Sequence, residues 1–365
     1  MSKIVSVKTK QIQTKLAGND FITTYGKEPT TRHHVIVSIE SDNGVVGVGE
    51  ACPLPFTFDD DPDKIRREID HQLAPNLIGK NPFDMNVYQN LTDKFPTVGG
   101  TARTGVDLAL YDLMGKIRGV PVFELLGGQA QECVEIASVL GIGASETIAE
   151  AAVQQLQSGM RAVKIKVGLN VEKDVETLRL VREAVGKSAK IRADANTGYT
   201  VPEALQFLRV AEEMNLEYLE QPLPIENLQG FAQLQRKTSV PLMADESVYT
   251  YEDAKKLIEY DAVNLFGLKL IKHGGIFQTK RIAVLAEEYG IECVMISPWE
   301  TQIGVSAAVH IVLSGSNFNH PHELAPGSLR DDPFCGLHEL TGAYQAPTGT
   351  GLCIVPCHRQ QNPKS

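Results

Sequence analysis

Lysine and carboxylate side chains recur at regular intervals through the middle of this 365-residue chain. They follow in the order Lys164, Lys166, Asp194, Glu220, Asp245 and Lys269. From Lys166 onward, each lies 24 to 28 residues after the one before it, beside a short apolar run. The strands of a parallel βα barrel repeat at about this spacing, and their carboxyl ends meet at one rim. The spacing therefore predicts that these side chains gather at a single site.

Two of the lysines lie in one predicted strand, Val163 to Val167, where Lys164 and Lys166 alternate with apolar residues. Alternate side chains of a strand share a face, so both ammonium groups point the same way. Like charges this close, in a partly desolvated place, disfavour full protonation, and we expect a depressed lysine pKa. Such a lysine could take a proton near neutral pH, as a catalytic base must.

The three carboxylates indicate a metal site. Asp194, Glu220 and Asp245 each end a predicted strand, so their negative charges would converge. Converging carboxylates are costly unless a cation offsets them, and hard divalent cations prefer oxygen ligands. The sequence therefore predicts a divalent cation at the rim.

Composition narrows the class of protein. The net charge of −10, without a basic cluster, argues against a nucleic-acid partner. No apolar run approaches the ~20 residues that a membrane helix needs, and the first residues do not resemble a signal segment. The six cysteines are scattered without paired spacing, which is typical of reduced thiols. We expect a cytoplasmic protein with no membrane partner.

The first 127 residues predict an α+β domain. Alternating residues indicate strands at 3–14, 34–40 and 45–50, joined in part by the hairpin signal Asp42-Asn43-Gly44. Helical spacing follows at 62–77, 83–94 and 101–118.

Residues 128–327 predict an α/β barrel, opening with a strand at 134–140. We expect barrel helices at 172–185, 201–214, 227–236, 251–259 and 276–289, and the last two strands at 292–297 and 318–323. The βα rhythm ends near residue 330, so residues 328–365 are expected to pack back on the N-terminal domain.

The ordered set of motifs resembles the enolase superfamily, specifically its muconate lactonizing enzyme subgroup. The matching stretches are Lys164-Ile-Lys166, Asp194-Ala-Asn196, Glu220-Gln-Pro222, Asp245-Glu-Ser247 and Lys269-Leu-Ile-Lys-His-Gly-Gly275. The resemblance covers nearly the whole chain. It implies a modified (β/α)8-type TIM barrel under an α+β capping domain, which the N-terminal region and the C-terminal tail would build together.

The resemblance also implies a cofactor and a reaction. Mg²⁺, with Mn²⁺ as a substitute, would be held by Asp194, Glu220 and Asp245. The shared step is removal of the proton α to a carboxylate, which gives an enediolate that preplaced cations stabilise. Lys166 and Lys269 would act as acid and base on opposite faces of the substrate carbon. Lys164 would hold the charge of the substrate carboxylate.

Two bases on opposite faces favour a racemase or epimerase of an amino-acid derivative or dipeptide. The subgroup uses the same pair for cycloisomerisation, as in muconate lactonizing enzyme, and for syn-dehydration, so both remain alternatives. We also expect a small carboxylate as substrate and a homo-oligomer. Two other classes stay open: a barrel whose lysine forms a Schiff base, and a non-catalytic barrel that binds a small acid.

Substrate contacts are expected from capping-domain loops at 17–30 and 51–61, through Phe21, Thr24 and Phe56. Trp299, the only tryptophan, and Glu300 follow strand seven and could together receive a cationic substrate group.

The end of strand eight departs from the dipeptide epimerases of the subgroup. They carry Asp-X-Asp there, whereas this chain reads Asn319-His-Pro-His-Glu-Leu324. His322 and Glu323 are the candidate substrate contacts in this stretch. Asn196 and Glu246 are expected to support the metal ligands, and Lys272 to be a solvated charge.

Overall fold

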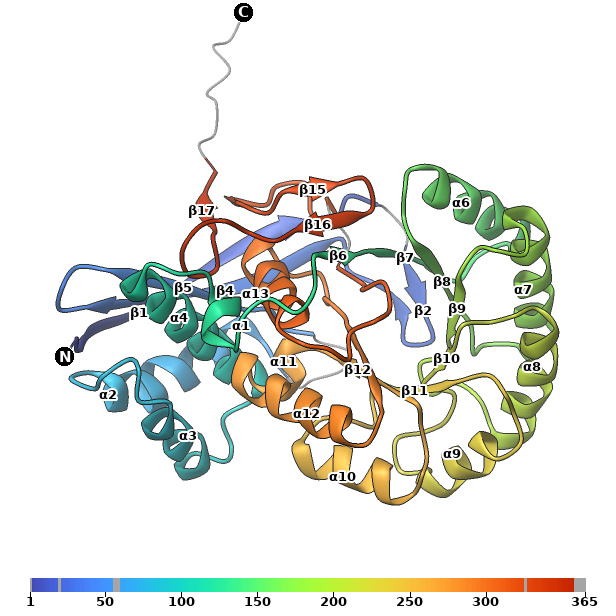
Figure 1. Cartoon of the computed structure of the whole chain (residues 1–365), viewed down its shortest axis with the longest axis horizontal. Helices are drawn as coiled ribbons and strands as arrows, with labels where there is room; N and C mark the ends of the chain where they lie inside the picture. The colour runs from blue at the N-terminus through green and yellow to red at the C-terminus, as the bar shows by residue number, and fades with distance from the viewer. Residues whose placement is uncertain (1, 19–20, 55–59, 325–326, 358–365) are drawn as a thin grey trace, which may run out of the picture.

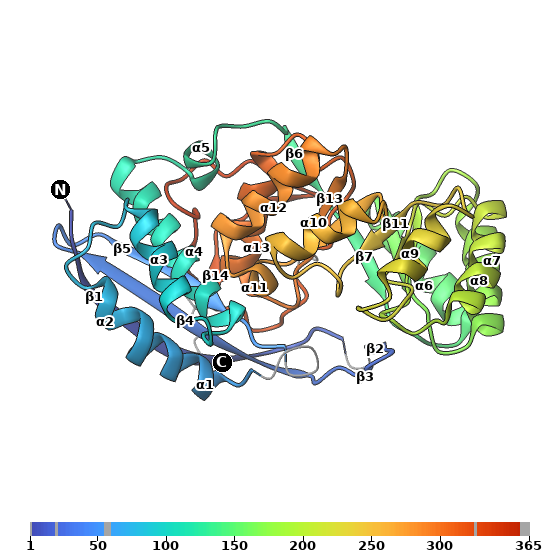
Figure 2. The ribbon, with the colours of Figure 1, turned by 90° about the horizontal axis from the view of Figure 1, so that it is seen from below.

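The computed structural model describes residues 2–18, 21–54, 60–324 and 327–357. An N-terminal sheet with its helices, here called the cap, lies beside a curved parallel sheet that is wrapped by helices (Figure 1). Figure 2 shows the cap sheet at one end of the molecule and the β2–β3 hairpin reaching from it toward the barrel strands. This arrangement confirms the predicted combination of barrel and cap.

A three-stranded antiparallel sheet forms the base of the cap. Its order is β1-β4-β5, with β1 at Ile4–Lys15, β4 at Thr31–Ser41 and β5 at Val46–Ala51. The predicted meander is therefore confirmed. The cap helices are α1 (Pro62–Glu68), η1 (Ile69–Leu73), α2 (Ala74–Leu77), α3 (Met85–Lys94) and α4 (Gly100–Arg118). The helical segment expected at 62–77 is present, with one π-helical turn, η1, inside it.

Helix α4 joins the cap sheet to the barrel. On its sheet side it meets Gly47 and Gly49 of β5, where an added Cβ would lie 2.2 Å from a carbonyl oxygen of the helix. Only glycine permits so close an approach. On its other side, the Asp107 carboxylate accepts a hydrogen bond from the backbone N–H of Ile276, at 2.6 Å. Since Ile276 begins a barrel helix, the two parts are held together at α4.

Seven parallel strands form the barrel sheet, in the order β13-β12-β11-β10-β9-β8-β7. They are β7 (Ala137–Leu140), β8 (Ala162–Lys166), β9 (Ile191–Asp194), β10 (Leu219–Glu220), β11 (Leu242–Ala244), β12 (Leu265–Leu268) and β13 (Glu292–Met295). Among the described residues, isolated bridges and no regular strand occupy the eighth position. His322 bridges to Ile136 and Glu323 bridges to Ile296, so the predicted segment 318–323 connects the two edges of the sheet.

The first predicted barrel strand, 134–140, is in fact two strands. Its first part is β6 (Cys133–Glu135), which pairs antiparallel with β16 (Ala343–Gln345) from the C-terminal segment. Only the second part, β7, belongs to the barrel sheet. The sequence does not reveal this division, because Val134 of β6 and Ala137 of β7 are both fully buried although the two strands pair with different partners.

The five predicted barrel helices are confirmed, as α7 (Val171–Val185), α8 (Val201–Glu213), α9 (Leu228–Gln235), α10 (Tyr251–Glu259) and α12 (Ile276–Glu288). Three more were not predicted: α6 (Ser145–Gln157), α11 (Leu270–His273) and α13 (Gln302–Leu313). Nearly all of α13 is buried, so it lacks the polar face by which an amphipathic helix is recognised. Among the described residues, no helix has the length and apolarity that crossing a bilayer requires.

The C-terminal segment touches both parts of the molecule. It contains the short strands β14 (Phe334–Cys335), β15 (Glu339–Leu340), β16 and β17 (Val355–Pro356). The N–H of Leu352 donates to Asp112 of the cap helix α4, at 2.8 Å. Its carbonyl accepts from Ser306 of the barrel helix α13, at 2.6 Å. The C-terminal segment therefore packs on the cap, as predicted, and also on the barrel. The domain boundaries at 127 and 327 stay a prediction.

Candidate active site

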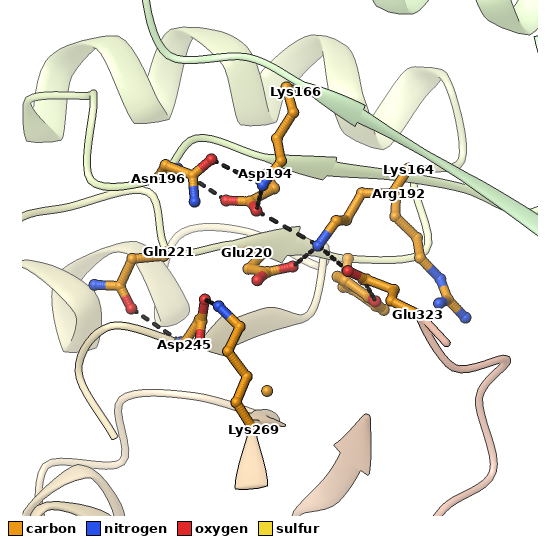
Figure 3. Close-up of polar contacts among 12 residues, drawn as sticks. Lys164, Lys166, Arg192, Asp194, Asn196, Glu220, Gln221, Asp245, Lys269 and Glu323 are labelled. Atoms are coloured by element: carbon orange, nitrogen blue, oxygen red, sulfur yellow. Dashed lines mark hydrogen bonds and ion pairs between the residues drawn. The ribbon is translucent and has the colours of Figure 1, made fainter. Parts of the chain in front are cut away.

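The three carboxylates predicted to bind a metal lie at the ends of neighbouring barrel strands. Asp194 ends β9, Glu220 ends β10 directly opposite it in the register, and Asp245 follows β11. All three are buried. Figure 3 shows them in one group, with lysine side chains reaching in around them. The spacing in the sequence thus predicts which side chains the fold brings together.

Lys164 bridges several carboxylates. Its Nζ lies 2.7 Å from Glu220 and 3.4 Å from Asp194, and it also pairs with Glu323 (Figure 3). Burial by itself lowers the pKa of Lys164, but the charges of Glu220, Glu323 and Asp194 raise it well above its usual value. The expectation of a depressed pKa is therefore wrong for Lys164. Carboxylates surround its ammonium group, and they outweigh the like charge of Lys166.

Lys166 projects from the same face of β8 as Lys164 and reaches Asp194. Its Nζ donates to Asp194 at 2.5 Å and to the side-chain oxygen of Asn196 at 2.9 Å. The backbone N–H of Asn196 donates to Asp194 at 2.8 Å, and its side-chain amide donates to Glu246 at 3.0 Å. Asn196 and Glu246 thus lie beside Asp194, in the surroundings of the predicted metal ligands.

Asp245 is held by two lysines. Lys269, which follows β12, donates to its Oδ2 at 2.5 Å. Lys272, one helical turn further on, donates to its Oδ1 at 2.6 Å, to its backbone carbonyl at 2.7 Å and to the carbonyl of Gly267 at 2.9 Å. Burial opposes ionisation of Asp245, but the charges of Lys269 and Lys272 lower its pKa.

Lys272 was expected to be a solvated charge, and the structure corrects this. It is buried, and all three of its hydrogen bonds fix Asp245 and the adjacent strand end. The signal that could have found it is the spacing Lys269-Leu-Ile-Lys272, because residues three apart on a helical turn face the same side.

Replacing Lys272 by methionine should lower kcat/KM by about 10- to 100-fold, as loss of partners behind a metal ligand does. Asp245 would lose the donor that fixes Oδ1 and would turn away from its position. Steady-state kinetics at saturating metal measure this effect. The control is Lys280→Met, since Lys280 donates to the carbonyl of Ser314 on the outer helices. If the two variants have equal kinetics, Lys272 does not position Asp245.

The β2–β3 hairpin of the cap, with strands Ile22–Thr23 and Gly26–Lys27, closes over the site. Its tip contacts residues next to two of the carboxylates. The hydroxyl of Thr24 donates to the carbonyl of Asn196 at 3.0 Å, and that of Tyr25 donates to Glu246 at 2.7 Å. Thr24 thus contacts the barrel. Through Asn196 and Glu246, the hairpin is connected to the surroundings of both Asp194 and Asp245.

Beneath the hairpin lies a cavity of about 180 Å³. Its polar part contains the site residues, and its apolar part contains side chains from the cap and from the loop after β13. Phe21 and Trp299 meet there edge to face, with ring centroids 5.1 Å apart. The apolar wall consists of Phe21, Leu54, Val139, Ile296, Pro298 and Trp299. Of the residues predicted to bind substrate, Phe21, Trp299 and Glu323 line this cavity.

Two other predicted contacts lie elsewhere. Glu300 lines a second cavity, of about 120 Å³, whereas the neighbouring Trp299 lines the first. His322 is buried beside β13, where its Nδ1 accepts from the backbone N–H of Met295 at 3.1 Å. Alternate residues of an extended segment face opposite ways, so Glu323 reaches the site and His322 does not. Phe56 lies outside the described residues.

A separate buried group, His34, Glu50 and Cys52, has potential metal-ligand atoms within 4.8 Å of one another. The hydrogen bonds of this group hold the fold together. Glu50 already accepts from His34 at 2.7 Å, from the N–H and hydroxyl of Thr301, and from the N–H of Gly304 at 3.0 Å. These bonds tie the cap sheet to the start of α13, and thereby hold the loop that carries Trp299.

Two family descriptions match the chain. "Mandelate racemase / muconate lactonizing enzyme, N-terminal domain" matches residues 13–127, and "Enolase C-terminal domain-like" matches residues 147–360. The chain belongs to this enolase-superfamily group. The resemblance seen in the sequence motifs is therefore confirmed.

Individual relatives cover nearly the whole chain. N-succinyl-L-Arg/Lys racemase of Bacillus cereus is 32% identical over 335 residues, which are 89% of this chain and 90% of the relative. L-Ala-D/L-Glu epimerase of Bacillus subtilis is 32% identical over 357 residues, 97% of each chain, and its substrate-liganded structure has a TM-score of 0.91. A dipeptide epimerase of Enterococcus faecalis, solved with Mg and L-Leu-L-Tyr, is 30% identical, with a TM-score of 0.91 over 96% of this chain and 99% of that one.

These relatives share the fold of this enolase-superfamily protein from the cap to the C-terminal segment. They are named as racemases and epimerases, and the protein described here is likewise an isomerase of the enolase superfamily. The predictions of family, fold and enzyme class are confirmed together.

Proposed function

We propose that this protein is a divalent-metal-dependent racemase or epimerase, which exchanges the proton α to the carboxylate of an amino-acid derivative. The observation that carries the proposal is the placement of two lysines around one group of carboxylates. Lys166 reaches Asp194 from β8, and Lys269 reaches Asp245 from beyond β12, on the opposite side of the group in Figure 3. A substrate carbon held between them would have a base on each face.

The residues present fit a divalent cation. Asp194, Glu220 and Asp245 would hold it, and the Oε1 atom of Glu220 is buried without a hydrogen-bond partner among the described residues. Such an oxygen is suited to a metal ion, and an all-carboxylate set suits Mg²⁺ or Mn²⁺. When bound there, the cation supplies positive charge that offsets the negative charge developing on the substrate carboxylate.

The lysines supply the proton chemistry. For one enantiomer Lys166 would remove the α-proton and Lys269 would return a proton to the other face, and for the opposite enantiomer the roles reverse. Lys164, paired with Glu323 at the end of the eighth segment, would stand beside the substrate carboxylate and stabilise its charge. Burial excludes water from around these groups and so strengthens each electrostatic contact.

The relatives favour this reaction over the alternatives. Cycloisomerisation and syn-dehydration would use the same lysines, and muconate cycloisomerase 1 of Pseudomonas putida is also 32% identical, over 78% of this chain. The racemase and the epimerase named above match more of the chain, 89% and 97%. A Schiff-base enzyme needs a lysine freed from strong ion pairs. Lys164, Lys166 and Lys269 each pair with a carboxylate.

Proton exchange tests the proposal directly. We expect that incubation with Mg²⁺ in deuterated water replaces the α-proton of a substrate by deuterium and yields both configurations at that carbon. Proton NMR follows the exchange, and chiral chromatography follows the configuration. A panel of N-acyl amino acids and dipeptides that shows no exchange, together with borohydride trapping of a lysine adduct, would instead identify a Schiff-base enzyme.

A further inference from the structure

Two cysteines that are separated in the sequence meet at the end of the C-terminal segment. Strands β14 and β17 pair antiparallel, with Cys335 opposite Val355. Two residues after Val355, the backbone N–H of Cys357 donates to the carbonyl of Pro333 at 2.8 Å, which continues the pairing. Alternate residues of a strand face the same side, so Cys335 and Cys357 lie diagonally across this ribbon on one face.

The two thiols interact directly. The thiol of Cys357 is hydrogen-bonded to that of Cys335, and both side chains are partly exposed. Burial, together with the hydrogen bond and the charge of Cys335, raises the pKa of Cys357 to about 11. Cys357 therefore keeps its proton near neutral pH and shares it with the sulfur of Cys335. Because the thiolate is the reactive form of cysteine, Cys335 is the sulfur that would attack an oxidant first.

The other cysteines have different surroundings. Cys52 and Cys293 are buried, and burial raises the pKa of both thiols, which makes them inert. The thiol of Cys353 donates to the carbonyl of Gly351 at 3.7 Å. Cys133 is exposed on β6, so it is the competitor for an oxidant that reaches the protein from solution.

The ribbon of β14 and β17 closes the last part of the fold. Between these strands the chain pairs with β6 through β16, and Leu352 is bonded to both α4 and α13. Figure 1 shows β17 at the outside of the molecule. The ribbon has two paired residues in each strand, and Val355 is 57% exposed. So short and exposed a pair of strands is marginally stable, and a covalent link across it would fasten the end of the segment.

We propose that Cys335 and Cys357 form a redox modification site, where a hydroperoxide produces a disulfide bond that fastens the β14–β17 ribbon. The Cys335 thiolate attacks a peroxide oxygen, the O–O bond breaks, and a sulfenic acid and hydroxide result. The sulfur of Cys357 then attacks the sulfenic sulfur, the S–O bond breaks, and the oxygen leaves as water with the proton of Cys357. Overall, two thiols and one hydrogen peroxide give one disulfide and two water molecules, and the peroxide gains the two electrons that the sulfurs lose.

The geometry permits this bond. A disulfide holds its sulfur atoms about 2.0 Å apart, closer than two hydrogen-bonded thiols. Rotation of two partly exposed side chains at an exposed ribbon provides this approach. The bond would be reversible, because a thiol reductant attacks an exposed disulfide readily.

The modification is independent of the proposed isomerase reaction. The described residues that line the cavity of the candidate active site include neither Cys335 nor Cys357. We therefore expect oxidation to change the stability of the C-terminal segment and to leave turnover unchanged at temperatures well below melting.

Mass spectrometry of the peroxide-treated full-length protein tests the proposal. After digestion without reductant, we expect a pair of peptides joined through Cys335 and Cys357, and dithiothreitol should separate them. Two of the six thiols should be lost to titration in denaturant. The melting temperature should rise by about 2–5 °C, because the bond closes a loop of the unfolded chain. Hydrogen exchange at the backbone N–H of Cys357 should also become slower, since its bond to Pro333 opens less often.

Matched serine variants check the cause. Cys335→Ser and Cys357→Ser should each lose the joined peptides and the rise in melting temperature. Cys133→Ser, which removes the exposed cysteine outside the ribbon, should behave like the wild-type protein. If a ribbon variant does not fold, the exchange and peptide measurements on wild-type protein still decide. Free Cys335 and Cys357 in protein whose Cys133 is already oxidised would overturn the proposal. A link between Cys335 and Cys357 that changes neither melting nor hydrogen exchange would overturn it too, since the bond would then fasten nothing.

Discussion

Lys166→Ala and Lys269→Ala should each lower kcat by about 10²- to 10⁴-fold, the usual range for loss of a general acid or base. The reason is geometric, since Lys166 approaches the carboxylates at Asp194 and Lys269 approaches them from the opposite side, at Asp245 (Figure 3). Racemisation needs both lysines, so neither loss is compensated by the other. Chiral chromatography of the product measures the effect.

The two variants should differ in what they retain. Each should still exchange the α-proton of the one enantiomer whose proton faces the remaining lysine, without inverting it. Proton NMR in deuterated water, run separately on each enantiomer, detects this half-reaction. Lys255→Ala is the control, because Lys255 pairs with Glu252 on the barrel surface and should have normal turnover. Near-native racemisation by both site variants would show that the two-base assignment is wrong.

The sequence predicts those site residues that lie at the ends of the repeating barrel strands. Asp194, Glu220 and Asp245 each follow an apolar run, and parallel strands place such residues at one rim. Position along a strand therefore predicts which side chains meet. It does not predict which atoms pair, because that depends on side chains arriving from other strands.

The pKa of Lys164 illustrates this limit. The sequence shows Lys166 two residues away, and like charges predict a lowered pKa. The neighbours that decide the result, Glu220 and Glu323, arrive from the fourth strand and the eighth segment. Lys272 is a second case, since a lysine on a short loop looks solvated until the strand beside it is placed.

Two further differences between the predicted and the observed structure concern α13 and the turn at Trp299. Helix α13 is apolar on all sides because barrel, cap and C-terminal segment cover it, so periodicity does not mark it. Adjacency in the sequence predicts one shared site for Trp299 and Glu300. Trp299 has a φ of 69°, in a turn, and the two side chains line different cavities. Sequence neighbours in a turn do not share a direction, and only the backbone conformation reveals this.

Removing the metal should abolish racemisation, and restoring Mg²⁺ or Mn²⁺ should recover it. The same titration should raise thermal stability, because an ion that binds only the folded state stabilises it by about 2.7 kcal/mol at 100 times its Kd. Without the ion, Asp194, Glu220 and Asp245 depend on lysines for compensation, and the Oε1 atom of Glu220 has no partner among the described residues. The ion would satisfy that oxygen and free Lys166 and Lys269 for proton transfer.

Three readouts distinguish a site ion from a general salt effect. Racemisation measures function, the melting temperature measures binding to the folded state, and the fluorescence of Trp299 reports on the cavity that it lines. The control is Asp245→Asn, which keeps the size of the side chain but removes one ligand charge. The Asp245→Asn variant should need far more Mg²⁺ than the wild-type protein for the same rise in melting temperature. A monovalent salt such as KCl should produce no such rise in either protein. Full racemisation after chelation, with no stabilisation on adding Mg²⁺, would show that these carboxylates serve the lysines and hold no catalytic ion.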